Sequence, residues 1–373
     1  MQIIPVNLNG RRNQRDFIKF PFDLYKNYPQ WVPPIRSSMR KIFKASTPFY
    51  SYGEASFFLA KDQHGEILGR LAVANNHRYN QIHQSKTAFF YYFEVSEDQQ
   101  VAEALFSSGF EWARKQGLNH ILGPKGFTVL DGFGMLIKGF EFPPAFGQPY
   151  NLPYYPDFMD SMGFSKVTDV FTGKIEPPFE LPEKVSRAAK LVNKRYGLHA
   201  PLIQSKSELR KSVKKIKRLY NESLANPAGN PSITDEDIDA MASQLMWIAD
   251  PRLIKILHKN NDPIGWLMAY PDIGPALQRT KGRLFPLGWI QILLESKRTS
   301  WIDLNGYGIV EKYQRMGGTA ILFNELYKSA KQIDQYTYVE ALQFREENIK
   351  SLIEVANFDI EFHKTHRLYE KSI

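Results

Sequence analysis

A glycine pair near the C-terminal end of the chain has the residue types of an anion-binding turn. Positions 310–323 read VEKYQRMGGTAILF, so basic residues and two glycines lead into an apolar run at helical spacing. The first turn of a helix carries unpaired N–H groups and a partial positive charge, which attract phosphate. Glycine lets the backbone approach the anion closely, and Lys312 and Arg315 add cationic donors. We predict that Gly317 and Gly318 cradle a phosphate group; the alternative is a tight strand-to-helix turn without a ligand.

The composition predicts a globular chain of two domains. Its 373 residues exceed one ordinary domain, and 43% of them are hydrophobic. The lack of cysteine excludes disulfides, thiolate zinc sites and a cysteine nucleophile. No stretch reaches the ~20 apolar residues of a membrane span, and the first residues have no apolar core of signal-peptide length, so we expect a cytoplasmic protein.

The formal net charge of +9 favours an anionic partner, and much of it is concentrated in one segment. Twelve Lys or Arg residues lie at 184–218 against one acid, Glu208, after a proline-rich linker. The alternatives are a solvated helix face, steering of an anionic ligand, or contact with an anionic membrane at the inner membrane face. Nucleic-acid binding is disfavoured because no recognisable nucleic-acid module is present.

The two halves of the chain predict the same order of elements: a hairpin, a strand, an amphipathic helix, a strand, a short helix, a turn and a strand. An Asn stands at the start of each short helix, Asn151 and Asn348. The strand–helix–strand step implies a parallel pair with a right-handed crossover, whereas the hairpins are antiparallel. We therefore predict an α/β (α+β) fold with two lobes, each a mixed, mostly antiparallel sheet flanked by helices. The hairpin, the next strand and the long helix are expected at 54–76, 87–95 and 97–117, and again at 252–270, 300–310 and 318–332.

This order, with the glycine turn between strand and helix, resembles the Gcn5-related N-acetyltransferase (GNAT) superfamily. The signature of that superfamily is Gln or Arg, two residues, Gly, one residue, then Gly or Ala. Gln314 and Gly317 fall on the first two positions, whereas Thr319 departs at the third and is followed by the small Ala320. The segments QWVPPI, PYNLPYYPDFMDSMGF and GWLMAYPDIGPALQR are similar to a group of bacterial tandem-GNAT acyltransferases, a group that resembles bacterial ceramide synthases.

The resemblance implies acetyl-CoA or a longer acyl-CoA as co-substrate, bound by the second lobe. It implies lobes at 1–178 and 198–373, joined by a basic linker or helix at 179–197. The first lobe is expected to be degenerate, because its junction FEVSEDQQVAEAL has no glycine and carries Asp98 and a capping pattern of Ser96 with Gln99. The residues expected to bind acyl-CoA are Ile309, Val310, Gln314, Arg315, Gly317, Gly318, Thr319, Ala320 and Asn348.

Acyl transfer to an amine needs a base, an oxyanion stabiliser and a proton for the thiolate. The resemblance places a backbone N–H for the oxyanion near Ile309 or Val310, and a Tyr acid at 355, where this chain has Val355. Substitutes for that acid are Tyr369 and Tyr307. The expected bases are Glu340, as first choice, and Asp303; His363 and His366 flank the same region, and no metal site is predicted.

Two further segments concern the acceptor. The run LFPLGWIQILL at 284–294 is predicted to be a buried core helix; the alternatives are an apolar wall for an acyl chain and an interfacial membrane anchor. The inserted loop at 123–156 is expected to form a lid or acceptor pocket, with Asn151, Tyr154 and Tyr155 lining a cleft or simply packing.

The function expected from these residues is acyl-CoA-dependent N-acyl transfer to a small-molecule or lipid-like amine. One alternative is an aminoacyl-tRNA-dependent peptidyltransferase, in which the basic segment would bind RNA. A second is a non-catalytic acyl-CoA-binding protein, favoured by Val355 and Thr319. No obligate protein partner is inferred.

Overall fold

The structure is a computed structural model that describes residues 1–8, 10–127, 131–177, 179–225 and 231–373. It divides into two compact units. The N-terminal unit contains Met1–Val170, Gly274–Gln291 and Lys364–Ile373, and the C-terminal unit contains Phe171–Ile273 and Ile292–His363. These units differ from the boundaries expected at 178 and 197, because two later segments of the chain pack into the N-terminal unit.

The N-terminal unit is built on a sheet with the strand order β1-β2-β3-β4-β5-β13. Neighbouring strands are antiparallel except β4 and β5, which are parallel over three residue pairs. The strands are β1 (Gln2–Pro5), β2 (Gly53–Lys61), β3 (Ile67–Asn76), β4 (Thr87–Val95), β5 (His120–Gly123) and the later part of β13 (Glu361–Ser372), which also pairs with β6 (Met135–Lys138).

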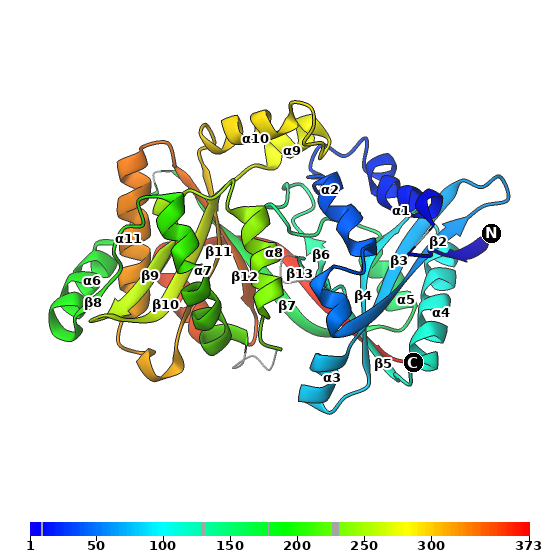
Figure 1. Cartoon of the computed structure of the whole chain (residues 1–373), viewed down its shortest axis with the longest axis horizontal. Coiled ribbons are helices and arrows are strands. Elements are labelled where there is room, and N and C mark those ends of the chain that lie inside the picture. The colour runs from blue at the N-terminus through cyan, green and yellow to red at the C-terminus, as the bar shows by residue number, and fades with distance from the viewer. Residues whose placement is uncertain (9, 128–130, 178, 226–230) are drawn as a thin grey trace. The chain divides into compact units, whose positions relative to one another are not determined.

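Helices cover both faces of this sheet (Figure 1). Alternate residues of β3 point to opposite faces, so Leu71 and Val73 pack with the α4 side chains, whereas Ala72 and Ala74 pack with those of α1. The helices are α1 (Arg11–Leu24), α2 (Arg36–Met39), α3 (His77–His83), α4 (Gln99–Lys115), α5 (Tyr155–Ser161) and α9 (Gly274–Thr280).

The C-terminal unit repeats the plan, with the strand order β8-β9-β10-β11-β12-β7. Here β11 and β12 are the parallel pair, and β8, β9, β10 and β11 are antiparallel neighbours. The strands are β8 (Leu198–His199), β9 (Lys255–Lys259), β10 (Asp262–Pro271), β11 (Trp301–Ile309), β12 (Tyr338–Arg345) and the later part of β7 (Ser165–Ile175).

Alternate residues of β10 also point to opposite faces of the sheet, and different helices cover each face. Leu267 and Ala269 belong to the core shared with α11 and α6, whereas Met268 and Tyr270 lie beneath α7 and α8. The helices are α6 (Glu183–Tyr196), α7 (Lys206–Tyr220), α8 (Asp235–Leu245), α11 (Gly318–Ile333) and α12 (Ile349–Val355), together with the part of α10 (Gly288–Ser296) from Ile292 onward. Among the described residues, every helix falls short of the length and apolar character that a membrane crossing requires.

The predicted duplication and fold class are confirmed: hairpin, strand, helix, strand, short helix and final strand follow in both halves. What the sequence did not reveal is the destination of the final strands. The strand after α5 ends next to β12, and the strand after α12 ends next to β5, so each unit receives its last strand from the other half of the chain.

The apolar run at 284–294 is not the predicted buried core helix. It forms a turn and α10, and Phe285, Leu287, Trp289, Ile290 and Leu294 are exposed. The interpretation was wrong because apolar content alone does not tell a buried helix from an exposed apolar surface.

Candidate active site in the C-terminal unit

The parallel strands β11 and β12 separate part-way along their length. Their register runs over four pairs, from Trp301 with Tyr338 to Leu304 with Ala341. Within the described residues no pair follows, although β11 continues to Ile309 and β12 to Arg345. A bulge in the pairing of β10 with β11 lies at this level, between Met268 and Ala269. Among the described residues, the edge of β11 facing β12 therefore has no strand partner beyond the last pair, and on it the Ile309 carbonyl accepts the Gln314 amide.

Two buried carboxylates stand where the strands separate. Asp303 and Glu340 are register partners, so their side chains lie on the same face of the sheet, and they are 5% and 6% exposed. Nε2 of the buried His363 lies 3.0 Å from Oε1 of Glu340. The structure thus brings together the two predicted bases and one of the two predicted histidines. Among the described residues, no three His, Asp or Glu side chains are arranged to hold a metal ion.

The backbone of Ile309 faces the open edge. The N–H of Val310 donates to the carbonyl of Ile264 on β10 at 2.9 Å, and successive backbone groups of a strand point to opposite sides. The N–H of Ile309 therefore points away from β10, towards the side from which β12 has diverged. Val310 cannot supply the expected N–H, because its own is already bonded to β10.

The equivalent position in the N-terminal unit is filled by side chains. Val95 pairs with Gly69 as Ile309 pairs with Gly265, so Val95 and Ile309 are matching ends of their strands. The Tyr155 hydroxyl accepts the N–H of Val95 at 2.8 Å, and the Tyr154 hydroxyl donates to its carbonyl at 2.7 Å. These hydroxyls take both backbone groups that a ligand would need.

The N-terminus of α4 is also capped from within. Asp98 accepts the N–H groups of Gln100 and Val101, which corrects the predicted Ser96 cap, since the Ser96 hydroxyl instead donates to the carbonyl of Leu68. The helix start therefore already carries a carboxylate, as the sequence led us to expect.

The glycine turn of the C-terminal unit has the backbone shape that an anion cradle requires. Gln314 ends a 3₁₀ turn (Glu311–Tyr313) and donates its amide to the carbonyl of Ile309 at 3.1 Å. Arg315 and Gly317 have φ values of +64° and +80°, in the left-handed region. Gly317 is the N-cap of α11, and among the described residues no side chain caps that helix start.

The second glycine has a packing role. A Cβ on Gly318 would lie 2.6 Å from a methyl carbon of Leu257 and 2.9 Å from one of Ile309, and a Cβ on Gly317 would lie 2.5 Å from Val192 of α6. Gly318 is therefore needed for close packing of α11 on the sheet, in addition to any contact with a ligand.

A carboxylate that the sequence did not point to lies beside the turn. The hydroxyls of Thr319 and Tyr307 both donate to Oε2 of Glu354, at 3.2 and 3.1 Å. Burial, followed by the charge of Glu354, raises the pKa of Tyr307 well above its usual value. Asn348, expected to bind the co-substrate, accepts the N–H of Ser351 and so caps its own helix.

Tyr307 and Glu340 lie on opposite faces of the sheet. Tyr307 pairs with Leu267 and packs edge-on against Phe323 of α11, whereas Glu340 is on the face beneath α7 and α8. The structure therefore does not bring Tyr307 to the predicted base.

Several predicted site residues belong to the N-terminal unit instead. Tyr369 pairs with Gly123 of β5 in its core, and burial raises the pKa of Tyr369 to about 12. His366 Nε2 lies 3.1 Å from the carbonyl of Pro149.

Asn151 bonds both backbone groups of Leu136 on β6 and lies four residues before α5, so it is not a counterpart of Asn348. Tyr369 and His366 lie in the N-terminal unit because the final strand β13 joins its sheet, whereas Asn151 is held by β6.

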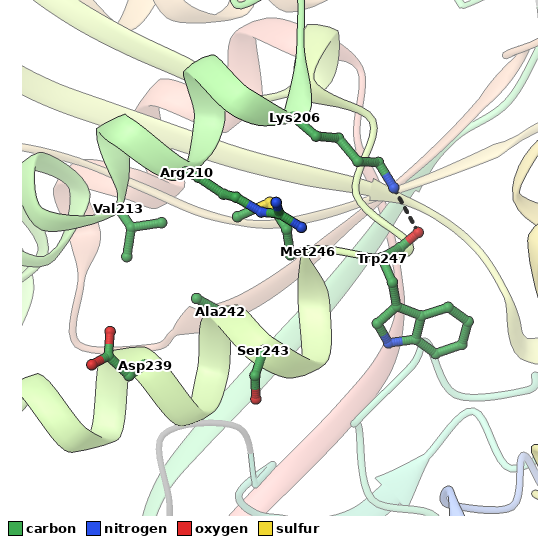
Figure 2. A pocket seen from close by; sticks show the side chains of 8 residues that line it. All are labelled: Lys206, Arg210, Val213, Asp239, Ala242, Ser243, Met246 and Trp247. Carbon is green, nitrogen blue, oxygen red and sulfur yellow. Dashed lines mark hydrogen bonds between the residues drawn. The ribbon is translucent and has the colours of Figure 1, made fainter.

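A hollow opens between α7 and α8, with a volume of about 480 Å³. Figure 2 shows the lining residues, with Arg210 and Val213 on α7, Ala242 and Ser243 on α8, and the Lys206 ammonium donating to the carbonyl of Trp247 at 2.8 Å. A smaller, almost wholly apolar space lies against it and shares three of its lining residues. That space is lined by Leu209, Val213, Ile216, Ile238, Met241, Ala242, Leu245, Met246, Ala249, Ile254, Met268 and Tyr270.

This apolar space reaches the level of the acidic pair. Tyr270 is the register partner of Asp303, and Asp303 is the register partner of Glu340, so all three side chains lie on one face of the sheet. The hollow and this inner space, which has a volume of about 40 Å³, together form what we call the apolar passage; its inner end is lined by Tyr270, the register partner of Asp303.

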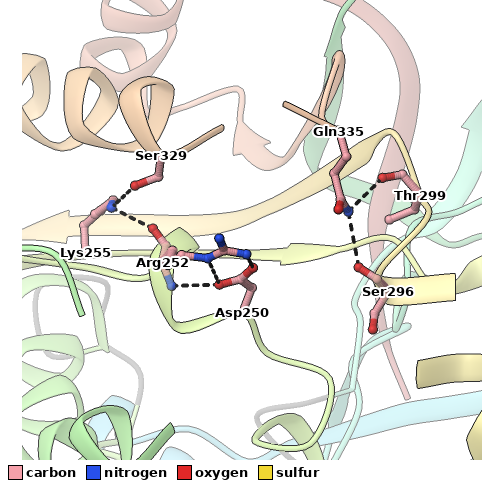
Figure 3. Close-up of polar contacts among 7 residues, drawn as sticks. All are labelled: Asp250, Arg252, Lys255, Ser296, Thr299, Ser329 and Gln335. Carbon is pink, nitrogen blue, oxygen red and sulfur yellow. Dashed lines mark hydrogen bonds and ion pairs between the residues drawn. The ribbon is translucent and has the colours of Figure 1, made fainter. Parts of the chain in front are cut away.

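A buried lysine on the other face takes no part in this arrangement. The Lys255 ammonium donates to the Ser329 hydroxyl and the Arg252 carbonyl, each at 2.7 Å, while Arg252 pairs with Asp250 (Figure 3). Burial lowers the pKa of Lys255 to about 8. Because Lys255 pairs with Leu267, it lies on the α11 face, opposite Asp303 and Glu340.

The fold is that of tandem GNAT proteins. A tandem GNAT protein from the clavulanic acid biosynthesis pathway covers 100% of this chain and 98% of its own, with a TM-score of 0.57 and 12% identity. A GNAT structure from Sphaerobacter thermophilus matches with a TM-score of 0.52 and 13% identity. This match covers 99% of the present chain and 95% of the Sphaerobacter chain. These likenesses establish the fold.

Two curated relatives match over nearly their whole lengths. Protein YghO of Escherichia coli K12 is 24% identical over 370 residues, covering 98% of this chain and 94% of its own. A bacterial ceramide synthase of Caulobacter vibrioides is 23% identical over 384 residues, covering 100% of this chain and 98% of its own. No protein-family model matches the chain.

Proposed function

We propose that the chain is an acyl-CoA-dependent N-acyltransferase whose C-terminal unit carries the reaction. The observation that carries this proposal is the open edge of β11: the Ile309 N–H faces the gap that opens beyond Asp303 and Glu340, six residues farther along the strand, whereas the matching N–H of Val95 is taken by Tyr155. Acyl transfer needs a backbone donor for the oxyanion and a base that receives the amine proton. The end of β11 offers the donor, and Glu340, farther back along the gap, is the candidate base.

The residues around α11 suit the phosphates of coenzyme A. The uncapped N-terminus of α11 and the left-handed Gly317 present backbone N–H groups, and the exposed Lys312 and Arg315 supply positive charge. The hydrogen bond from Thr319 holds the negative Glu354 carboxylate beside the first turn of α11, where it repels an incoming phosphate. Glu354 is exposed, so its side chain can turn into solvent when phosphate binds, once its hydrogen bonds from Thr319 and Tyr307 are broken.

The reaction balances with the residues at the strand separation. The amine nitrogen attacks the thioester carbon, the oxyanion is held by the N–H of Ile309, and the amine proton passes through water to Glu340, which lies about 20 Å back along the sheet. The C–S bond then breaks, and the thiolate leaves with a proton from water. We assign the thiolate no proton from Tyr307, because its raised pKa makes that phenol a poor acid and it lies on the other face. His363 orients the Glu340 carboxylate.

The apolar lining of the passage between α7 and α8 suits a lipid-like amine, whose chain would have to widen the inner space from its volume of about 40 Å³. The twelve residues that line the inner space are apolar except for the Tyr270 hydroxyl, and Tyr270 adjoins Asp303. A chain held there would present a head group at the carboxylates. The name of the Caulobacter relative, a ceramide synthase, is in line with a long-chain amine.

One observation favours a second candidate, a non-catalytic acyl-CoA-binding protein. The Glu354 contact with Thr319 places a negative charge at the start of α11, where it weakens the attraction for the phosphates. Turnover with any amine excludes this candidate. The peptidyltransferase alternative has no comparable support.

The substrate class is tested with Ala242→Trp, which fills the passage. Wild-type protein given palmitoyl-CoA should release CoA thiol with hexadecylamine far faster than with ethanolamine. We expect Ala242→Trp to lower kcat/KM for hexadecylamine by about tenfold or more, because the chain loses its apolar contacts, and to leave ethanolamine unchanged. Glu236→Trp, on the same helix but outside the passage, is the matched control.

Two other results would count against these claims. An absence of thiol release with every amine would rule out the transferase. An Ala242→Trp variant that keeps its preference for hexadecylamine would rule out the passage as the chain site while leaving the transferase standing.

A further inference from the structure

An exposed apolar surface is formed by the turn after α9 and the first residues of α10. Of the fifteen large hydrophobic side chains exposed among the described residues, four fall within six positions. Phe285, Leu287, Trp289 and Ile290 are 80%, 62%, 43% and 36% exposed, and we call them the apolar turn. Such clustering differs from the single exposed apolar residues of an ordinary surface and marks an interaction site.

The apolar turn is held in place by the N-terminal unit. Ala276 and Leu277 of α9 are fully buried, and the Gln278 amide donates to the carbonyls of Pro29 and Trp31 at 2.6 and 3.2 Å. The N–H of Arg36 donates to the carbonyl of Gly282, and its guanidinium to that of Lys281, both at 3.0 Å. The exposed side chains are therefore displayed by an anchored segment rather than by a loose loop.

Basic side chains surround the turn. Lys281 and Arg283 precede it and are exposed. Burial lowers the pKa of Arg36, and the nearby positive charges of Arg283 and Arg40 lower it further. Asp23 is the nearby acid, and it is paired with Lys19 at 2.8 Å. Aromatic and aliphatic side chains next to a cluster of Lys and Arg match an anionic bilayer, in which the rings enter the interface and the cations meet the head groups.

We propose that the apolar turn is a peripheral membrane anchor that inserts into the surface of an anionic lipid bilayer. Phe285 and Leu287 enter the acyl boundary, Trp289 lies at the head-group level, and Lys281 and Arg283 contact lipid phosphates. The twelve basic residues at 184–218, the earlier candidate for this contact, are divided between two helices that pack in the C-terminal unit. The anchor does not depend on the proposed acyl transfer.

Vesicle co-sedimentation of the full chain tests the anchor. We expect binding to vesicles of phosphatidylcholine mixed with phosphatidylglycerol, weaker binding to phosphatidylcholine alone, and weakening by salt. The triple variant Phe285→Ser, Leu287→Ser, Trp289→Ser should lower the partition coefficient by about tenfold or more, since the inserted apolar area is lost. Ile82→Ser, an exposed apolar residue on α3, should bind as the wild type does.

A second pair of variants separates insertion from charge. Lys281→Glu with Arg283→Glu should abolish the preference for phosphatidylglycerol while the protein stays folded. Unchanged vesicle binding of the triple Ser variant would overturn the proposal. So would a dimer of the wild-type chain in size-exclusion chromatography that the triple variant converts to a monomer, because the turn would then be covered by a second copy.

Discussion

Replacing Glu340 with glutamine should slow acyl transfer by at least about a hundredfold, because the isosteric amide cannot take the proton of the amine. The hydrogen-bonding position next to His363 is kept, so we expect the fold to survive. Acyl-CoA binding should be unchanged, since Glu340 lies on the face opposite the glycine turn. The measurement is kcat by thiol release together with binding by calorimetry.

A matched control and a second variant make this prediction specific. Glu347→Gln changes an exposed carboxylate just beyond β12 and should leave kcat unchanged. His363→Gln should lower kcat less than Glu340→Gln does and should shift the acidic limb of the pH–rate profile, because it removes the positioning partner of the base. A Glu340→Gln enzyme with wild-type kcat would show that another group, Asp303 first, removes the proton.

Replacing Arg70 with methionine should destabilise the N-terminal unit by about 3–5 kcal/mol, the cost of leaving a buried charge without its partner. Arg70 is 2% exposed and binds both carboxylate oxygens of Glu94, at 2.6 and 2.9 Å. It also donates to the carbonyl of Phe17 at 2.7 Å, and its guanidinium lies over the rings of Phe17 and Tyr92. All of these contacts are lost at once, whereas the unpaired Glu94 remains.

Denaturant unfolding followed by circular dichroism measures this effect. Since the chain has two units, we expect a separate, earlier transition for the N-terminal unit in the variant rather than a shift of a single transition. The double variant Arg70→Met, Glu94→Met should recover most of the loss. Lys61→Met, which breaks a less buried pair with Asp16, should cost no more than about 1 kcal/mol. A loss in Arg70→Met no larger than that in Lys61→Met would contradict the prediction.

Elements with a local cause could be predicted from the sequence. Hairpins, the two long helices and the glycine turn follow from periodicity and residue type over a few neighbouring positions, and the repeat in both halves could be read from their order. The pairing of Glu340 with Asp303 could also be predicted, because the two residues lie on neighbouring parallel strands that the sequence indicates.

Contacts made across long sequence separations could not be predicted. Whether the last strand pairs in its own half or the other half depends on which sheet edge is free, so Tyr369 and His366 were placed in the wrong lobe. The hydroxyls that block Val95 come from residues about sixty positions away. Glu354 reaches Thr319 from a helix whose sequence gives no sign of that contact.

The central claim is that the C-terminal unit alone binds acyl-CoA, and a calorimetric titration of the full chain with an acyl-CoA thioether tests it most directly. We predict one site per chain, lost in Gly317→Val and in the charge reversal Arg315→Glu, with circular dichroism showing that both variants are folded. Lys86→Glu, an exposed reversal in the N-terminal unit, should bind normally. Two sites per chain, no binding by the wild type, or binding that survives both changes at the glycine turn would contradict the account.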